Sequence, residues 1–306
     1  MLFSYPSPVP NSSSQLKTDA AGWLWISPWL IGFLAFLALP LAMSFYYSFT
    51  DYPLVESPLW IGLDNYKALL HDELFLKAAA KTALYASLSI PACTILALVI
   101  ASLLTARVRA EGFFQAAVFL PTLVPMSASA MIWLWLFNQQ NGVLNKIVTT
   151  LGLPQVNWLG KDGWVMAALV IVSLWGIGQM VIVYLAAMKE VPIHLYEAAA
   201  LDGMGPVRRF LNVTLPMISP VILFNVVTLT IGAVQVFTIP FVLTKATPGG
   251  DPHSMYFYTS AMYDNAFVYA KMGYASAQAW IQFLVVLLLT GLTFLFSRGY
   301  VHYRAG

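Results

Sequence analysis

The sequence predicts an all-α membrane protein that crosses the bilayer six times. Of its 306 residues, 59% are hydrophobic and only 9% are charged, whereas soluble domains carry about 25% charged residues. Six apolar runs are each long enough for a helix that spans a bilayer, which needs about 20 residues. The composition therefore excludes a soluble globular domain, and the net charge of +2 gives no reason to expect a nucleic-acid partner.

The apolar runs set the expected organisation of the chain. The spans are predicted at about 23–49, 82–105, 113–137, 164–188, 216–243 and 275–297. Residues 1–21 are polar and lack the charged head and short apolar core of a cleaved signal peptide. We therefore expect a disordered cytoplasmic tail over 1–21 and a transmembrane domain over 22–306.

Helix breakers lie inside most of the expected spans. Membrane helices tolerate such residues where neighbouring groups satisfy the freed backbone. The breakers are Pro40, Pro91, Pro121, Pro125, Gly176, Gly178, Pro240 and Gly291. They predict kinks in a helical bundle, with moving hinges as the alternative.

The arginines predict the orientation of the chain. An even number of spans places both termini on one side, and the side with the positively charged loops is cytoplasmic. All arginines fall on the side of the N-terminus, namely Arg107, Arg109, Arg208, Arg209, Arg298 and Arg304. On the opposite side lysines are balanced by acidic residues. We therefore expect a multi-pass protein of the cytoplasmic membrane with both termini inside the cell.

The loop between the fourth and fifth spans, residues 189–215, has strong local signals. Pro192 can occupy the first turn of a helix, and the alanines at 198–200 favour that helix. Gly203, Gly205 and Pro206 then end it. The pattern predicts two short helices joined by a sharp bend, exposed on the membrane surface.

This loop resembles the EAA loop of the inner-membrane permease subunits of ATP-binding-cassette importers. The matching residues are Glu197-Ala198-Ala199, Asp202-Gly203, Phe210 and Leu215-Pro216. Further matches point to the sugar-permease branch, at 187–192, Tyr196, 60–66, 75–82 and 119–138, with Gly142 and Asn145. The resemblance covers nearly the whole chain beyond the tail.

The resemblance implies an importer of several subunits. It pairs this chain with a second homologous permease, two ATP-binding-cassette ATPase subunits and an extracytoplasmic solute-binding protein. ATP and Mg²⁺ would bind to the ATPase subunits, and this chain would bind no cofactor. The residues implied to couple to the ATPase subunits are Tyr196, Glu197, Ala198, Ala199, Asp202, Gly203 and Arg208.

The sequence contains little that points to an enzyme. It has no phosphate-binding loop of the Gly-x-x-x-x-Gly-Lys-Ser/Thr type and no Gly-x-Ser-x-Gly elbow. The single cysteine, Cys93, excludes an intrachain disulfide. The four histidines of the chain are not spaced as metal ligands; they are His71, His194, His253 and His302. We expect neither catalytic residues nor a metal site.

Neutral polar side chains inside the spans indicate the solute. Proton- or sodium-coupled carriers usually need buried ionisable groups, and such groups are almost missing from these spans, with Lys81 at a span edge. Amides and aromatic rings suit the hydroxyls and apolar faces of a sugar, and Trp175, Gln179, Asn225 and Gln235 are the expected path residues. Hydrogen bonding between helices is the alternative role for each. The sequence thus predicts import of a sugar, oligosaccharide or related polyol. A stand-alone secondary carrier or channel is the alternative, and a membrane-embedded enzyme comes third.

Overall fold

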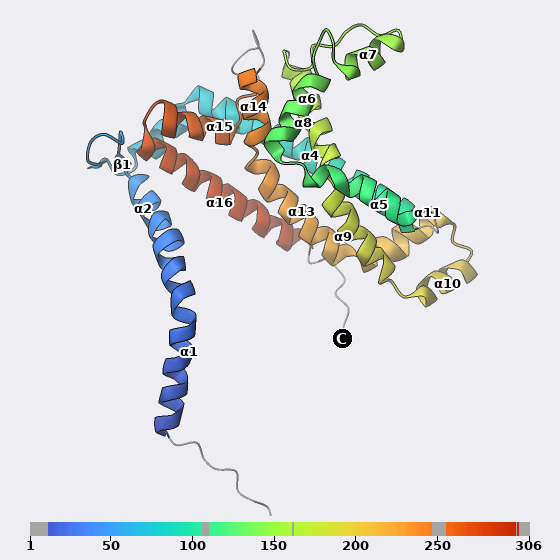
Figure 1. Ribbon diagram of the computed structural model, residues 1–306, viewed down its shortest axis with the longest axis horizontal. Coiled ribbons are helices and arrows are strands. Elements are labelled where there is room, and N and C mark those ends of the chain that lie inside the picture. Colours follow the sequence, from blue (N-terminus) through green and yellow to red (C-terminus); the bar gives the residue numbers. More distant parts are fainter. Residues whose placement is uncertain (1–11, 106–109, 161, 247–254, 298, 300–306) are drawn as a thin grey trace, which may run out of the picture.

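The computed structural model describes residues 12–105, 110–160, 162–246, 255–297 and 299. This part of the chain is almost entirely helical (Figure 1). Four of its helices are each long and apolar enough to cross a bilayer, and two bent helix pairs pass the same test only when each pair is taken together. The predicted six spans are therefore reached only if each bent pair counts as one span.

The first span stands apart from the other helices. Helix α1 (Ser12–Phe33), the π-helix η1 (Leu34–Ala38) and α2 (Leu39–Tyr47) form one long rod. Figure 1 shows α1 leading away from the bundle, and no residue in the apolar stretch of this span is buried. Contact with the bundle is made at the end of α2, where the rings of Phe45 and Trp280 lie 4.8 Å apart.

The predicted disordered tail is wrong from Ser12 onward, because α1 begins there. Adding residues to an existing helix requires no new nucleation. Leu16, Lys17, Ala20 and Ala21 are good helix formers, so the helix of the span continues into them. Residues 1–11 lie outside the described part of the chain.

A small folded cap follows the first span. Strands β1 (Thr50–Asp51) and β2 (Leu59–Trp60) pair antiparallel and are followed by α3 (Asp64–His71). Asn65 is buried and donates hydrogen bonds from Nδ2 to the carbonyls of Ser48 (3.0 Å) and Thr50 (2.9 Å). This hairpin is an exception to the predicted all-α class within the described residues.

Helix α4 (Glu73–Thr105) is the central helix, and it begins upstream of the predicted start at residue 82. Asp72 Oδ1 accepts hydrogen bonds from the backbone N–H groups of Leu74 (2.9 Å) and Phe75 (3.1 Å), which satisfies free donors at the helix start. Cys93, Ala97 and Ala101 are fully buried beside α9. Small side chains allow two membrane helices to approach closely.

The third and fourth predicted spans are both broken. Helices α5 (Glu111–Phe119) and α6 (Met126–Leu136), joined by the 3₁₀ turn η2 (Leu120–Leu123), meet at 100°. Helices α8 (Asp162–Trp175) and α9 (Gly178–Lys189) meet at 49°. The breaks fall at the predicted prolines and glycines, which confirms their interruption of the spans, but a 100° turn is far sharper than an ordinary kink.

The remaining helices include the last two spans and the short helices outside them. The amphipathic helix α7 (Val143–Thr150) projects beyond α6. The fifth span is divided into α13 (Ser219–Val234) and α14 (Thr238–Ala246), and the sixth is α16 (Met272–Ser297). Between them lie α15 (Tyr258–Tyr263) and the π-helix η4 (Asp264–Val268), where the sequence predicted only a loop.

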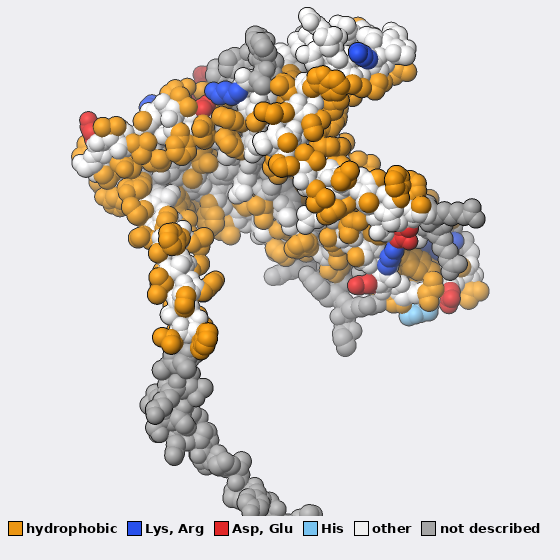
Figure 2. All heavy atoms as spheres, in the orientation of Figure 1, with side chains coloured by type: hydrophobic (Ala, Val, Ile, Leu, Met, Phe, Trp, Pro, Cys, Tyr) orange, Lys and Arg blue, Asp and Glu red, His pale blue; other side chains and the backbone are white. Residues whose placement is uncertain are grey.

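Hydrophobic side chains cover the outside of the molecule as well as its core. Figure 2 shows them over most of one face, with charged side chains gathered along the upper edge and around α10 at the lower right. A bilayer core requires such an uncharged band between two polar ends. The chain is thus a multi-pass membrane protein. The arginines at 107, 109, 298 and 304 lie outside the described residues.

Candidate functional site

Loop 189–215 is a compact helical turn. It contains α10 (Ile193–Leu201), α11 (Pro206–Arg209), the π-helix η3 (Phe210–Thr214) and α12 (Leu215–Met217). Pro192 lies just before α10 as its N-cap, and Pro206 is the first residue of α11. Proline suits the start of a helix because the missing N–H would have no partner there. The predicted helix before the bend is α10, and the predicted segment after it is divided into α11, η3 and α12.

Gly203 makes the bend after α10. Its φ is +73°, a left-handed conformation that costs other residues about 1–2 kcal/mol. The Gly203 N–H donates to the carbonyl of Ala200 (3.1 Å), and the Met204 N–H donates to that of Ala199 (3.0 Å). These two bonds form a Schellman motif, which satisfies carbonyls left free at the end of a helix.

Two residues hold α10 against its own loop. The Tyr196 hydroxyl lies 2.9 Å from Thr214 Oγ1, which joins α10 to η3. Ala199 is only 4% exposed, so its small side chain serves packing within the chain. Both residues were predicted to contact an ATPase subunit, and the structure places them on the inner side of the loop.

The outer side of the loop is exposed. Glu197, Ala198, Asp202, Gly203 and Arg208 are all exposed. Figure 1 shows α10 projecting from the end of the bundle. The loop thus presents a short, firmly held helix with a carboxylate and a small apolar side chain at its surface.

The predicted path residues separate into two pairs. Gln179 and Gln235 are exposed and lie at helix breaks, at the start of α9 and between α13 and α14. Asn225 is buried, and its Nδ2 donates to the carbonyl of Val221 on the same helix (3.0 Å). Trp175 is half-buried with its ring edge-on to that of Trp133, 5.9 Å away. The structure therefore leaves the two glutamine side chains exposed and gives the other two residues partners within the protein.

A polar group that was not among the predicted path residues lies beside Gln235. Gln282 is buried, and its Nε2 donates to the carbonyl of Val234 (2.9 Å) and to Thr259 Oγ1 (3.1 Å). It thereby satisfies a carbonyl at the break between α13 and α14. A glutamine within the last span was visible in the sequence, but its partner was not. Among the described residues, no group of three or more His, Cys, Asp or Glu is placed to hold a metal ion.

Comparison with known proteins assigns the chain to a family. Residues 75–304 match the model of the binding-protein-dependent transport system inner membrane component. The chain belongs to this family. It is therefore a permease of the binding-protein-dependent type, and the resemblance seen in loop 189–215 agrees with that assignment.

Relatives of this permease align over nearly its whole length. The probable ABC transporter permease protein YesP of Bacillus subtilis is 35% identical over 97% of this chain and 96% of its own. The trehalose/maltose transport system permease protein MalF of Thermococcus litoralis is 34% identical over 92% and 95%. The sn-glycerol-3-phosphate transport system permease protein UgpA of Escherichia coli is 30% identical over 92% and 95%.

A solved structure shows the same fold. A chain of a bacterial ABC transporter involved in the import of the acidic polysaccharide alginate matches with a TM-score of 0.81 at 24% identity, over 94% of this chain and 99% of that one. The likeness extends beyond residues 75–304 and so takes in the first span.

Proposed function

We propose that this permease is one membrane subunit of an ATP-driven importer for a sugar, an oligosaccharide or a related polyol. The observation that carries the proposal is the family match over 75–304 together with full-length relatives named for sugars or sugar-like solutes. The exposed glutamines at two helix breaks support it, since irregular backbone within a membrane is expected where it lines a cavity.

The first span supports the proposal of a second, homologous permease. Its apolar stretch has no buried residue, and Figure 1 shows α1 directed away from the bundle. The end of α2 is fixed against α16, so α1 is held out in one direction. A second subunit and membrane lipid would together cover its surface.

The remaining partners follow from the same proposal. Two ATPase subunits would bind ATP and Mg²⁺ and contact the exposed side of α10, which we call the coupling helix. A solute-binding protein would deliver the solute from outside, by analogy with a bacterial alginate ABC transporter solved in complex with an alginate pentasaccharide-bound periplasmic protein. Closure of the ATPase subunits would push α10 and switch the side from which the path is open.

Reconstitution of the complex tests the proposal. The permease, its partner permease, the ATPase subunits and the binding protein are placed in liposomes, and uptake is measured for maltose, trehalose, diacetylchitobiose, sn-glycerol 3-phosphate and alginate oligosaccharides. ATP-dependent uptake of one of these would support the proposal. Uptake by this chain alone, without ATP, would instead identify a stand-alone carrier or channel.

The proposed orientation places both termini in the cytoplasm. We expect a green fluorescent protein fused after Gly306 to fluoresce, and alkaline phosphatase fused after Val55, which is 92% exposed in the hairpin loop, to be active. The two reporters require opposite compartments. An inactive phosphatase at Val55, beside an active one at a known external site, would reverse the proposed orientation.

The proposed path predicts that both exposed glutamines contribute to uptake. Gln179→Leu and Gln235→Leu should each lower uptake about three- to tenfold at low solute concentration, because one hydrogen bond contributes about 0.5–1.5 kcal/mol. Assembly should be unchanged, since the structure gives neither side chain a partner within the described chain. Gln140→Leu makes the same change in the exposed loop before α7 and serves as the control. Unchanged uptake in both path variants would remove these residues from the path.

A further inference from the structure

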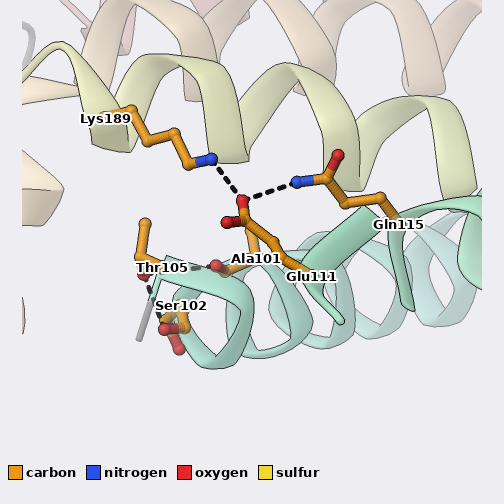
Figure 3. A network of polar contacts seen from close by, with 6 residues as sticks. All are labelled: Ala101, Ser102, Thr105, Glu111, Gln115 and Lys189. Atoms are coloured by element: carbon orange, nitrogen blue, oxygen red, sulfur yellow. Dashed lines mark hydrogen bonds and ion pairs between the residues drawn. The ribbon is translucent and has the colours of Figure 1, made fainter. Parts of the chain in front are cut away.

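The ends of α5 and α9 nearest the coupling helix are joined by charge (Figure 3). Lys189, the last residue of α9, forms an ion pair with Oε1 of Glu111, the first residue of α5. Gln115 Nε2 donates to the same oxygen at 2.7 Å. Each charge also complements the dipole of its own helix, since cations favour helix C-termini and anions favour N-termini.

The opposite ends of the same two helices touch through their backbones. A Cβ added at Gly178, the first residue of α9, would lie 2.3 Å from the carbonyl oxygen of Val118 and 2.9 Å from Cα of Phe119. Val118 and Phe119 are the last residues of α5. Helices α5 and α9 are therefore antiparallel and joined at both ends, so they form one unit.

The breaks in the third and fourth spans lie beside this unit. Helix α5 is followed by the 100° turn into α6, and α9 is preceded by the 49° turn from α8. Beyond the breaks, Trp133 of α6 meets Trp175 of α8. Each broken span thus has one half in the α5–α9 unit and the other half beyond it.

The coupling helix is connected directly to the α5–α9 unit. Only residues 190–192 separate Lys189 from the start of α10, and Val191 among them is 9% exposed. A displacement of α10 therefore reaches Lys189 through three residues of chain, and it reaches η3 through Tyr196. Along α9 it can continue through the chain, but it reaches the N-terminal end of α5 across the Lys189–Glu111 pair.

We propose that the Lys189–Glu111 ion pair, braced by Gln115, transmits movement of the coupling helix to α5 and so to the sharp turn between α5 and α6. Lys189 and Glu111 are positioning residues for transport, not contacts for the solute. This inference rests on the proposed function, because it requires ATPase subunits that move α10.

Spin labels on either side of the turn between α5 and α6 test the proposal. The labels are placed at Ala117 on α5 and Met131 on α6, both exposed, in the reconstituted complex with Cys93 replaced by alanine. The distance between the labels is measured before and after trapping with ATP and vanadate. In the labelled chain that keeps Glu111 and Lys189, we expect trapping to change this distance. Glu111→Lys or Lys189→Glu should reduce the shifted population about tenfold, since residues in direct contact couple strongly.

Two controls show whether the pair transmits movement or only stabilises the complex. The first is co-purification of the ATPase subunits, and the second is a double variant in which the two charges are exchanged. Both single variants should keep the ATPase subunits on purification, because the exposed side of α10 is unchanged. The double variant Glu111→Lys/Lys189→Glu should restore the shift. Glu73→Lys reverses an exposed pair with Lys77 at the start of α4 and should behave as the native sequence.

The outcomes distinguish this inference from the proposed function. If the complex with native charges at 111 and 189 does not retain the ATPase subunits, the proposed function is wrong and the inference with it. If that complex shifts and Glu111→Lys shifts equally, the inference alone is wrong. A double variant that stays unshifted would also overturn it, because a charge pair should tolerate exchange.

Discussion

Replacing Gly203 with valine should leave the permease in the membrane and remove the contact that we propose it makes with ATPase subunits. The φ of +73° at this position is unfavourable for any residue with a Cβ by about 1–2 kcal/mol, and more so for a β-branched one. Valine would therefore open the Schellman motif, release the carbonyls of Ala199 and Ala200, and turn the exposed side of α10 away from its partner. We expect transport to fall at least about tenfold, since 1.4 kcal/mol corresponds to that factor.

Gly205 offers a matched control for this prediction. It lies in the same turn, but its φ is −69° with ψ of 168°, an extended conformation that valine adopts readily. Gly205→Val should keep transport and the ATPase subunits. Full ATPase retention and full uptake in Gly203→Val would show that the bend is not needed for coupling.

Glu197→Lys tests the carboxylate on the same helix. A charge-assisted bond from Glu197 to an arginine or backbone N–H of the ATPase would be roughly twice as strong as a neutral one, and reversal of the charge would replace attraction with repulsion. We expect ATPase subunits to be lost on purification or to hydrolyse ATP without transport. Uptake at the level of the native chain would remove Glu197 from the proposed docking contact.

Local rules explain why loop 189–215 could be predicted from the sequence. Glycine after a helix and proline at the start of the next act within a few residues, and both Gly203 and Pro206 take those positions. The run of alanines gave no such guidance. Ala198 is exposed and Ala199 is buried, and three identical residues carry no apolar pattern that marks the inner side.

Features set by distant contacts could not be predicted in the same way. Pro121 and Pro125 indicated an interruption in the third span, but no local pattern predicted its 100° angle or the close approach of α5 to α9. The Lys189–Glu111 pair joins residues separated by 78 positions, and no local pattern connects them. The early start of α4 is different, because Asp72 before a helix-forming run is a local capping signal. The predicted start at residue 82 followed hydropathy alone and did not use this signal.

The contact that fixes the first span centres on Gly273, in the first turn of α16. A Cβ at this position would lie 2.0 Å from the carbonyl oxygen of Thr50 and 3.1 Å from that of Tyr47. Nearby, the Met272 N–H donates to the carbonyl of Tyr52 at 2.9 Å. The start of α16 thus presses directly on the backbone that joins α2 to the hairpin, and this contact helps to set the direction in which α1 leaves the bundle.

Gly273→Ala should therefore weaken assembly of the complex. One methyl group would force the backbone of Thr50 away, and overpacking of this kind costs about 1–3 kcal/mol or more. Displacement of α2 would also move α1, and the apolar stretch of this span has no buried residue. We expect less second permease to co-purify and a lower unfolding temperature of the complex. Gly291→Ala lies in the same helix with no atom within 4 Å of the added Cβ, so it should leave both measurements unchanged. Equal co-purification of the second permease in the two variants would show that this contact does not position the first span.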